Sequence, residues 1–192
     1  MQPLRRPAPA ITRTGVTAWL RQRVRVGLPL AIVCAWLASP TPAAVAFGAG
    51  IAAVGLSIRA VAASHLHKNV ALITSGPYAF TRNPLYLGTA AVAAGLLVAA
   101  HSWTVALLGA VYLIAFYPAA MRSEERKMRA RYGSAFDAYA ARVPLFWPRR
   151  PPPGSAQFNW SWDLYRRNGE YQSAVGVLAG IALLWLKTRR WA

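Results

Sequence analysis

Four stretches of the chain contain no Asp, Glu, Lys or Arg, namely residues 26–39, 41–58, 84–121 and 172–186. Hydrocarbon offers no partner for free backbone N–H and C=O groups, so apolar runs rich in Ala, Leu, Val and Gly predict helices that cross a membrane. The third stretch is roughly twice the length needed to cross about 30 Å of hydrocarbon, and the polar triplet 101–103 divides it. It therefore predicts a hairpin of two helices.

The first two stretches predict a second hairpin. Between them, Pro40 and Pro42 remove backbone donors and force the chain out of a helix. We predict an all-α fold, a polytopic membrane protein with four or five transmembrane helices in two hairpins plus a C-terminal helix. The first four spans are expected near residues 26–38, 43–61, 85–100 and 104–121.

The last apolar stretch leaves two interpretations open. Residues 172–186 are short for a membrane span. Lys187, Arg189 and Arg190 follow them, and a fifth crossing would put these cations on the side that carries few basic residues. The stretch is either a tilted fifth span or a re-entrant or interfacial helix.

The opening residues 1–46 resemble a signal peptide, with a basic region, an apolar run and small residues near Ala44 and Ala46. The charged region of 25 residues is long for such a peptide. We therefore interpret the first apolar run as an uncleaved helix.

Composition and charge give this hydrophobic chain an orientation. The 192 residues are 56% apolar, which excludes a disordered basic tail, and 22 Lys and Arg stand against 5 Asp and Glu. Nineteen of the 22 basic residues lie in segments that the two hairpins bring to one side of the membrane. Basic residues near span ends favour the cytoplasmic side, so we expect a bacterial-type inner (plasma) membrane protein with its N-terminus and its pocket in the cytoplasm. Anionic lipid head groups account for the charge without a nucleic-acid partner.

The chain divides into a basic N-terminal segment (1–25), a membrane core (26–148), and a C-terminal part (149–192) with a linker, an interfacial segment and the last apolar helix. A single cysteine, Cys34, excludes a disulfide framework and a multi-cysteine metal site. No metal site is expected at the histidines, because His65 and His67 are two residues apart and no carboxylate lies nearby.

A polar segment, residues 64–88, joins the two hairpins. It contains the turn dipeptides Gly76-Pro77 and Asn83-Pro84, and each proline fixes its own backbone and restricts the residue before it. We expect a rigid loop at the membrane surface, with Asn83 as the N-cap of the third helix and Pro84 in its first turn.

A second polar segment, residues 121–139, begins where the fourth predicted span ends and holds two adjacent acids, Glu124 and Glu125. One interpretation is an exposed helix whose acids pair with Lys127 and Arg129, for about 0.2–0.5 kcal/mol per pair. The other is a binding role, because an ionisable group at the point of emergence is expensive to desolvate without a partner. We favour binding for Glu124.

Residues 60–148 carry four motifs in order, with spacings that suit the membrane spans. They are Gly76-Pro77-Tyr78, Arg82-Asn83-Pro84-x-Tyr86-x-Gly88, Glu124-Glu125-x-x-Met128, and Tyr132-Gly133-x-x-Phe136-x-x-Tyr139 up to Val143-Pro144. This ordered set resembles the core of the isoprenylcysteine carboxyl methyltransferase and phospholipid methyltransferase family. Members are integral membrane enzymes that bind S-adenosylmethionine in a cytoplasm-facing pocket closed by the C-terminal segment and methylate a lipid-borne acceptor.

The resemblance implies a methyltransferase that depends on S-adenosyl-L-methionine, with the bilayer and a lipid or isoprenoid-like acceptor as its partners. It implies Arg82 and Glu124 as the catalytic residues, with Glu124 holding a polar end of the cofactor; Arg82 can pair with the cofactor's carboxylate or with an anionic acceptor. Methyl transfer from a sulfonium is an in-line displacement that depends on positioning and on exclusion of water. The residues implied for cofactor binding are His65, Val70, Ala71, Leu72, Ile73, Gly76, Tyr78, Asn83, Pro84, Leu85, Tyr86 and Glu124.

Three positions depart from the family pattern. Asn83 stands where the family commonly has His, so this position cannot serve as a general base. Ala120 stands where the isoprenylcysteine enzymes carry Arg, which argues against a prenylcysteine carboxylate as the substrate. Met128 replaces the usual Leu.

Two alternatives are an NADPH-dependent membrane reductase of the sterol-reductase type and a non-catalytic membrane scaffold. The variant Glu124→Gln separates them: an enzyme should lose cofactor affinity, whereas a scaffold should lose nothing. We expect S-adenosylmethionine and S-adenosylhomocysteine to bind the purified protein in calorimetry, and to bind this variant more weakly. Binding of NADPH alone would favour the reductase.

Overall fold

The computed structural model describes residues 15–67 and 71–189, with side chains from residue 25 onward. All regular secondary structure in these two ranges is helical, as predicted, and they contain no strand. The elements are α1 (Gly15–Leu37), α2 (Pro42–His65), the short 3-10 helix η1 (Gly76–Ala79), α3 (Pro84–Ala100), α4 (Trp103–Tyr132), α5 (Ser134–Arg142), α6 (Trp162–Arg167) and α7 (Glu170–Thr188).

The four predicted spans lie in α1, α2, α3 and α4, apart from residue 38, which follows the end of α1, and the stretch 172–186 falls within α7. Three helices, α2, α4 and α7, are long and apolar enough to cross a membrane, whereas α3 and the apolar part of α1 (Arg25–Leu37) are shorter. This composition is that of an integral membrane protein. The number of crossings stays a prediction, and most of the basic N-terminal segment, residues 1–14, lies outside the described residues.

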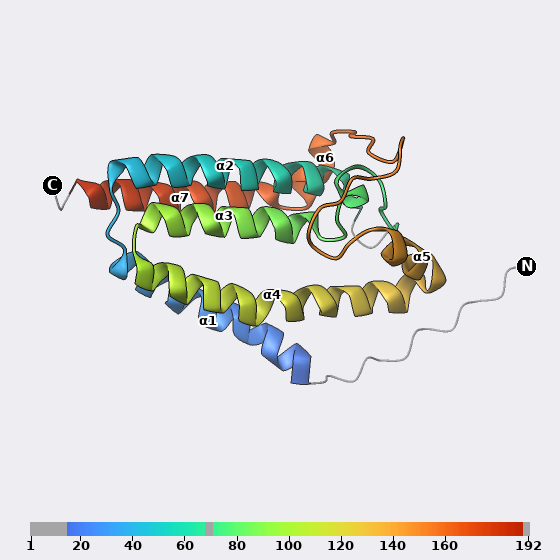
Figure 1. Cartoon of the computed structure of the whole chain (residues 1–192), viewed down its shortest axis with the longest axis horizontal. Coiled ribbons are helices and arrows are strands. Elements are labelled where there is room, and N and C mark those ends of the chain that lie inside the picture. Colours follow the sequence, from blue (N-terminus) through green and yellow to red (C-terminus); the bar gives the residue numbers. More distant parts are fainter. Residues whose placement is uncertain (1–14, 68–70, 190–192) are drawn as a thin grey trace, which may run out of the picture.

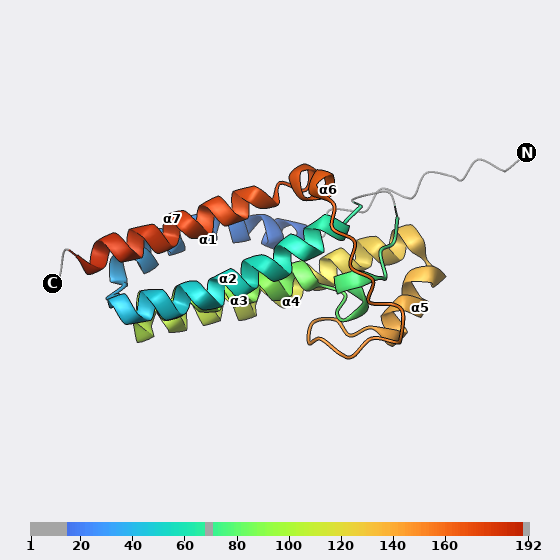
Figure 2. The same cartoon turned by 90° about the horizontal axis from the view of Figure 1, so that it is seen from above.

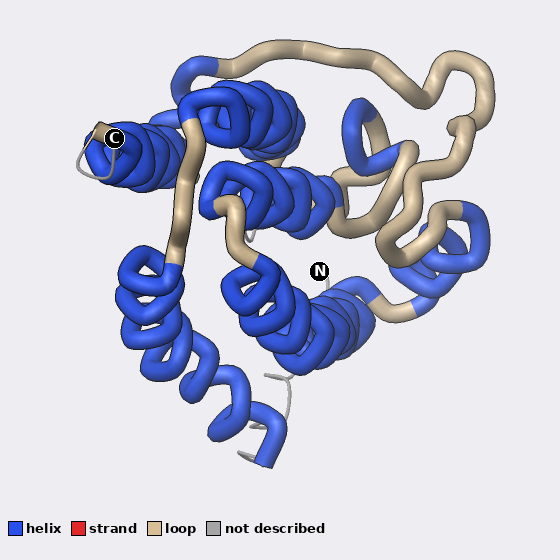
Figure 3. The backbone as a smooth tube through the Cα atoms, turned by 60° about the vertical axis from the view of Figure 1, so that its left-hand side comes forward, coloured by secondary structure: helices blue, strands red, loops and turns tan. Residues whose placement is uncertain are grey.

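The helices form an elongated bundle with its irregular segments at one end. Helices α2, α3 and α7 lie side by side, α4 packs beside α3, and α1 beside α4 (Figures 1 and 2). The short turns of the two predicted hairpins lie at one end of the bundle, and η1, α5, α6 and the long loops lie at the other (Figures 1 and 3). The polar segments with the sequence motifs are therefore gathered at this second end.

The closest packing in the bundle joins α2 to α3. Gly55 and Gly88 face each other, as do Gly48 and Gly95, in one antiparallel register. A Cβ atom at Gly55 would lie 2.6 Å from the Val92 nitrogen and 2.7 Å from the Gly88 oxygen. Because the two backbones touch, only glycine fits, and the helices gain the close contact that stabilises membrane helix pairs. We call these four residues the glycine seam.

A buried ion pair fastens α7 to this pair of helices. Arg59 of α2 donates to both carboxylate oxygens of Glu170 at 2.6 and 3.0 Å, and also to Ser173 and to Thr89 of α3. Glu170 is 6% exposed, so the two charges lie largely out of water and need each other. At the opposite end, Lys187 donates to the carbonyls of Ala35 and Trp36 and so ties α7 to the end of α1.

A single methyl group added to a glycine of the seam should lower the stability of the protein, whereas one added to a glycine elsewhere on α2 should not. Gly55→Ala would put a Cβ against backbone atoms that cannot move aside, so we expect the free energy of unfolding to fall by about 1–3 kcal/mol. Thermal unfolding in detergent measures this. Gly50→Ala on the same helix is the matched control, because no atom lies within 4 Å of its Cβ position. Equal unfolding temperatures for the two variants would contradict the seam.

Candidate functional site

The loop that holds η1 is bound to the segment after α5. The backbone N–H of Arg82 donates to the Pro144 carbonyl and that of Arg149 to the Phe80 carbonyl, both at 2.9 Å. The hydroxyl of Tyr139 donates to the carbonyl of Tyr78 at 2.7 Å. These hydrogen bonds hold the loop against residues more than 50 positions later in the chain, and its rigidity stays a prediction.

Between this loop, α4 and α5 lies a small inner hollow of about 60 Å³. Three polar atoms buried around it have no hydrogen-bond partner among the described residues: the hydroxyl of Tyr78, Nε of Arg82 and Oε1 of Glu125. Its lining is Leu66, Ala71, Leu72, Ile73, Tyr78, Arg82, Asn83, Glu124, Glu125, Met128, Phe136 and Tyr139. Buried polar atoms are normally paired, so this group marks a place for a polar ligand.

The Arg82 and Glu125 side chains form an ion pair across the inner hollow, with Nε 2.8 Å from Oε1. Both side chains are less than a fifth exposed. The other end of the guanidinium donates from Nη1 to the Ala140 carbonyl at 2.8 Å, which fixes its position. The two atoms of this ion pair do not have the geometry of a hydrogen bond, so Nε of Arg82 and Oε1 of Glu125 can each still form a hydrogen bond with a ligand.

The structure distinguishes the two adjacent acids of α4. Glu124 is more than half exposed and pairs with Lys127 at 3.2 Å, although it also borders the inner hollow. Glu125 points inward with Met121 and Met128, four positions before it and three after, on the buried face of α4. Sequence reasoning singled out Glu124 and missed this role of Glu125, which the helical spacing of the two methionines could have indicated.

The segment from residue 150 to residue 161, which we call the strap, crosses the end of α2. His65 accepts from the Asn159 N–H at Nε2 (2.9 Å), and its Nδ1 lies 2.8 Å from the Val61 carbonyl. This set of partners suits a neutral ring with its proton on Nδ1. The Phe158 ring packs against those of His65 and Phe80 at 6.0 and 6.1 Å.

The strap, α6 and the end of α2 enclose an outer hollow of about 430 Å³. Its lining is Ser64, His65, His67, Ile73, Ser75, Gln157, Asn159, Trp160, Ser161, Asp163, Leu164 and Arg167. Ile73 borders both hollows, so they are neighbours. Trp160 packs with Trp162 and Tyr165, with ring centroids 4.9 and 5.7 Å away, in the C-terminal part that is predicted to contain an interfacial segment.

Gly76 is required where η1 meets the strap. Its φ of +59° is rarely adopted by residues with a side chain, and a Cβ there would lie 2.7 Å from the His65 ring. Its N–H donates to the Ser155 carbonyl at 3.1 Å. Gly76 therefore lets the loop approach both His65 and the strap.

The implied cofactor residues are only partly brought together. Ala71, Leu72, Ile73, Tyr78, Asn83 and Glu124 line the inner hollow, and His65 and Ile73 line the outer one. Pro84 is buried at the start of α3, and Leu85 and Tyr86 border neither hollow. Val70 lies outside the described residues.

Asn83 holds the predicted N-cap position of α3, and Pro84 occupies the first turn as expected. The Asn83 side chain nevertheless makes no capping hydrogen bond, so this part of the prediction is wrong. Its amide instead donates to the Leu145 carbonyl at 3.0 Å. The Asn83 side chain is therefore bound to the segment after α5.

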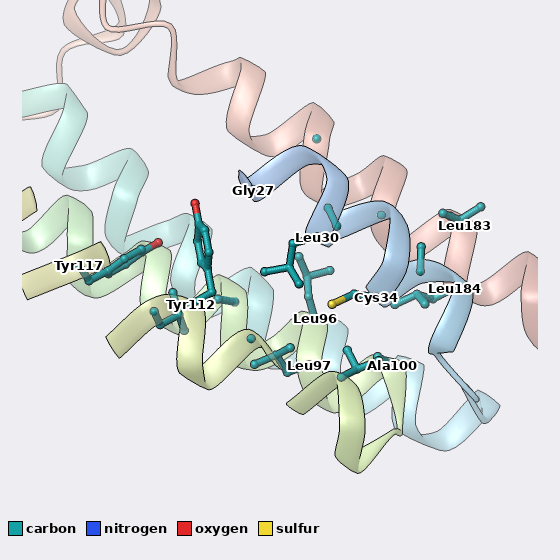
Figure 4. Close-up of a pocket in the computed structure, with 18 residues that line it drawn as sticks. Gly27, Leu30, Cys34, Leu96, Leu97, Ala100, Tyr112, Tyr117, Leu183 and Leu184 are labelled. Carbon is teal, nitrogen blue, oxygen red and sulfur yellow. The ribbon is translucent and has the colours of Figure 1, made fainter. Parts of the chain in front are cut away.

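A separate apolar cavity of about 440 Å³ lies within the helices, between α1, α3, α4 and α7 (Figure 4). Tyr112 and Tyr117 lie toward one end of it and Ala100 and Leu184 toward the other. Among the residues whose side chains the structure describes, those that line this cavity carry no charge.

Comparison with known proteins finds one family. Residues 44–135, from α2 to the start of α5, match the sequence model of the phospholipid methyltransferase family. The match includes η1, Arg82, both acids of α4 and the glycine seam. No solved structure matches the chain significantly.

Curated relatives include two bacterial proteins and one yeast enzyme. A nickel-cobalt-cadmium resistance protein of Alcaligenes xylosoxydans xylosoxydans and a cobalt-zinc-cadmium resistance protein of Cupriavidus metallidurans are each 38% identical over 82 residues, which is 43% of this chain and 38% of theirs. A protein-S-isoprenylcysteine O-methyltransferase of Schizosaccharomyces pombe is 29% identical over 97 residues, 50% of this chain and 41% of its own. The matches thus span less than half the length of these relatives.

The two buried phenols of the site predict a loss of stability in alkali. Burial raises the pKa of Tyr78 and of Tyr139, so both stay neutral in the folded protein at a pH where an unfolded tyrosine, with a pKa of about 10, ionises. The folded state then binds more protons, and the stability present below that pH is lost as the pH rises above it.

We expect Tyr78→Phe to flatten this loss, measured as unfolding temperature against pH in detergent. Tyr171→Phe, which removes a half-exposed hydroxyl from α7, is the matched control. The same slope for wild type and Tyr78→Phe would contradict the burial of this phenol.

Proposed function

We propose that the chain, whose residues 44–135 match the phospholipid methyltransferase family, belongs to that family and transfers a methyl group from S-adenosyl-L-methionine to a lipid or isoprenoid-like acceptor in the bilayer. The observation that carries the proposal is the group of three buried polar atoms, on Tyr78, Arg82 and Glu125, that make no hydrogen bond within the described residues. The family supports methyl transfer, and the resemblance to the yeast enzyme supports an acceptor held in the membrane.

The inner hollow suits the amino-acid end of this cofactor. Arg82 and Glu125 present a positive and a negative group side by side, which complements the carboxylate and the ammonium of an α-amino acid. The Tyr78 hydroxyl can donate to the same carboxylate. At about 60 Å³ the hollow has room for roughly two groups the size of a water molecule, enough for this end alone.

The outer hollow suits the nucleoside end. Its volume of about 430 Å³ lies within the range of small-molecule sites, roughly 300–1,000 Å³. Trp160 offers a ring for stacking, and Gln157 and Asn159 offer amides for hydrogen bonds to a base or a ribose. His65 and the strap would then hold the cofactor between α2 and residues 155–161.

S-adenosylmethionine supplies a methyl group on a sulfonium, which is transferred by in-line displacement. The protein's contribution is then to position two reactants and exclude water. The loop around η1 is fixed by its hydrogen bonds to residues 139–149, and the strap covers it from the aqueous side. Arg82 and Glu124, implied as catalytic by the resemblance, act in this proposal by orienting charged groups at the inner hollow.

The site end of the bundle carries most of the described basic residues, among them Arg82, Arg122, Arg126, Arg149 and Arg150. We infer that this end faces the cytoplasm, in keeping with the preference of basic residues for that side. A bacterial-type inner membrane is the corresponding location.

The adjacent acids of α4 provide a matched test. We expect Glu125→Gln to weaken binding of S-adenosylhomocysteine by on the order of tenfold, because an ionised hydrogen-bond partner contributes about 1.5–3 kcal/mol. Glu124→Gln should weaken it less, because Glu124 is exposed and already paired with Lys127. Calorimetry on detergent-purified protein measures both, and thermal unfolding checks that each variant is folded.

If Glu124→Gln weakened binding of S-adenosylhomocysteine more than Glu125→Gln did, Glu124 would be the residue that holds the cofactor, as the family resemblance implies. Binding of NADPH without S-adenosylhomocysteine would instead favour the reductase. If neither S-adenosylhomocysteine nor NADPH bound the wild type, the result would favour the non-catalytic membrane scaffold.

A further inference from the structure

The middle of the strap is held by two hydrogen bonds. Within the described part of the chain, residues 151–160 are joined to other segments by the Gly76 N–H, which donates to the Ser155 carbonyl at 3.1 Å, and by the Asn159 N–H, which donates to Nε2 of His65 at 2.9 Å. The first bond joins two backbone groups. The second depends on a histidine, the side chain whose charge ordinarily changes between about pH 5 and 8.

The partners of His65 admit one protonation state of the ring. A backbone N–H cannot accept a hydrogen bond, so Nε2 carries no proton and accepts from Asn159. A carbonyl cannot donate, so Nδ1, 2.8 Å from the Val61 oxygen, carries the proton of the neutral ring. The Ser64 hydroxyl, 3.1 Å from Nδ1, donates to the same carbonyl. A second proton would lie on Nε2 and face the Asn159 N–H, donor against donor.

The helix fixes the histidine, whereas the strap is irregular. His65 is the last residue of α2, and the Asn168 amide donates to two carbonyls of that last turn, both at 2.9 Å. The ring lies close to Gly76, where a Cβ would be 3.0 Å from Nε2. Residues 151–161 form no helix or strand. When the hydrogen bond between His65 and Asn159 is lost, the strap is therefore the partner that moves.

Neighbouring charges do not compensate for this loss. The titratable and charged groups on the elements around His65 are Arg59 of α2, His67, Tyr78 of η1, Arg82, Arg150 of the strap, Asp163 and Arg167 of α6, and Glu170 of α7. Asp163 lines the outer hollow together with His65, but it pairs with Arg167 at 3.0 Å and both are exposed. Glu170 pairs with Arg59. Both carboxylates of this set thus already have a cationic partner.

We propose that His65 is a positioning residue that holds the strap over the site only while its ring is neutral, and that protonation of the ring releases the strap. The closed strap then binds one proton fewer than the open strap. Closure is therefore present where the ring is neutral and is lost as the pH falls, by up to about tenfold per pH unit in the ratio of closed to open molecules. The contact stands on geometry alone, whereas the strap as a cover for S-adenosylmethionine rests on the proposed function.

The test is hydrogen exchange of backbone amides, measured by mass spectrometry on the full chain in detergent at about pH 8 and about pH 5. Each rate is divided by the intrinsic exchange rate at its pH. We expect peptides from residues 154–161, which contain the Asn159 N–H, to exchange about tenfold faster at the lower pH after this correction. The N–H of Arg82, which donates to the Pro144 carbonyl outside the strap, is the internal reference and should show no such change.

Two glutamine variants show whether His65 is the group that responds. His65→Gln offers an amide oxygen that can accept from Asn159 and takes up no proton, so we expect slow exchange of the strap at both pH values. His67→Gln is the matched control, because His67 is exposed on the same hollow, and it should keep the pH dependence of the wild type. Thermal unfolding checks that both variants are folded. Equal corrected exchange of the wild-type strap at the two pH values, or a His65→Gln strap that still loosens at the lower pH, would overturn the proposal.

Calorimetry with S-adenosylhomocysteine at the same two pH values separates this proposal from the previous one. If the wild type binds it more weakly at the lower pH and His65→Gln does not, both proposals are supported. A strap that opens with falling pH in a protein that binds no S-adenosylhomocysteine would refute the methyltransferase and leave the role of His65 standing. Binding of S-adenosylhomocysteine by a protein whose strap exchanges equally at both pH values would refute the role of His65 alone.

Discussion

The contact of the α2 and α3 backbones through Gly48, Gly55, Gly88 and Gly95 is the constraint on which the other features depend. Within a bilayer, apolar side chains gain little by leaving lipid, so close packing has to supply the attraction between helices. The seam fixes the antiparallel register of the two helices. That register brings the end of α2, with His65, and the beginning of α3, with Asn83, to the same end of the bundle, where the loop between them forms the floor of the candidate site.

The seam also makes room for the ion pair that holds α7. A side chain at Gly88 would collide with Cγ of Arg59, 2.6 Å from the Cβ position, so glycine at this position allows the arginine to pass between the helices. Arg59 then reaches Thr89, Glu170 and Ser173. Because two buried charges depend on each other, this pair fixes where α7 begins.

The candidate site depends on parts of the chain that are distant in sequence. Tyr78 and Arg82 come from the loop between the hairpins and Glu125 from α4, while Tyr139 and the backbone at 140–149 hold the loop in place. The strap covers the end of α2 through His65 and Gly76. This arrangement holds the loop in place and covers it with the strap, which suits the proposed methyl transfer because displacement depends on positioning and desolvation more than on acid–base groups.

The sequence by itself determined the helices, the turns between them and the motif-bearing segments, because hydrocarbon-length apolar runs and prolines act locally. It also indicated the rigid loop and the first turn of α3. Only the tertiary structure decided that Arg82 pairs with Glu125 and not with Glu124. It also decided that the Asn83 amide donates to the Leu145 carbonyl instead of capping its own helix. The same holds for Arg59, which pairs with Glu170, 111 residues later in the chain. The reason is that a charge or amide finds its partner through helix rotation and long-range register, and a linear pattern contains neither.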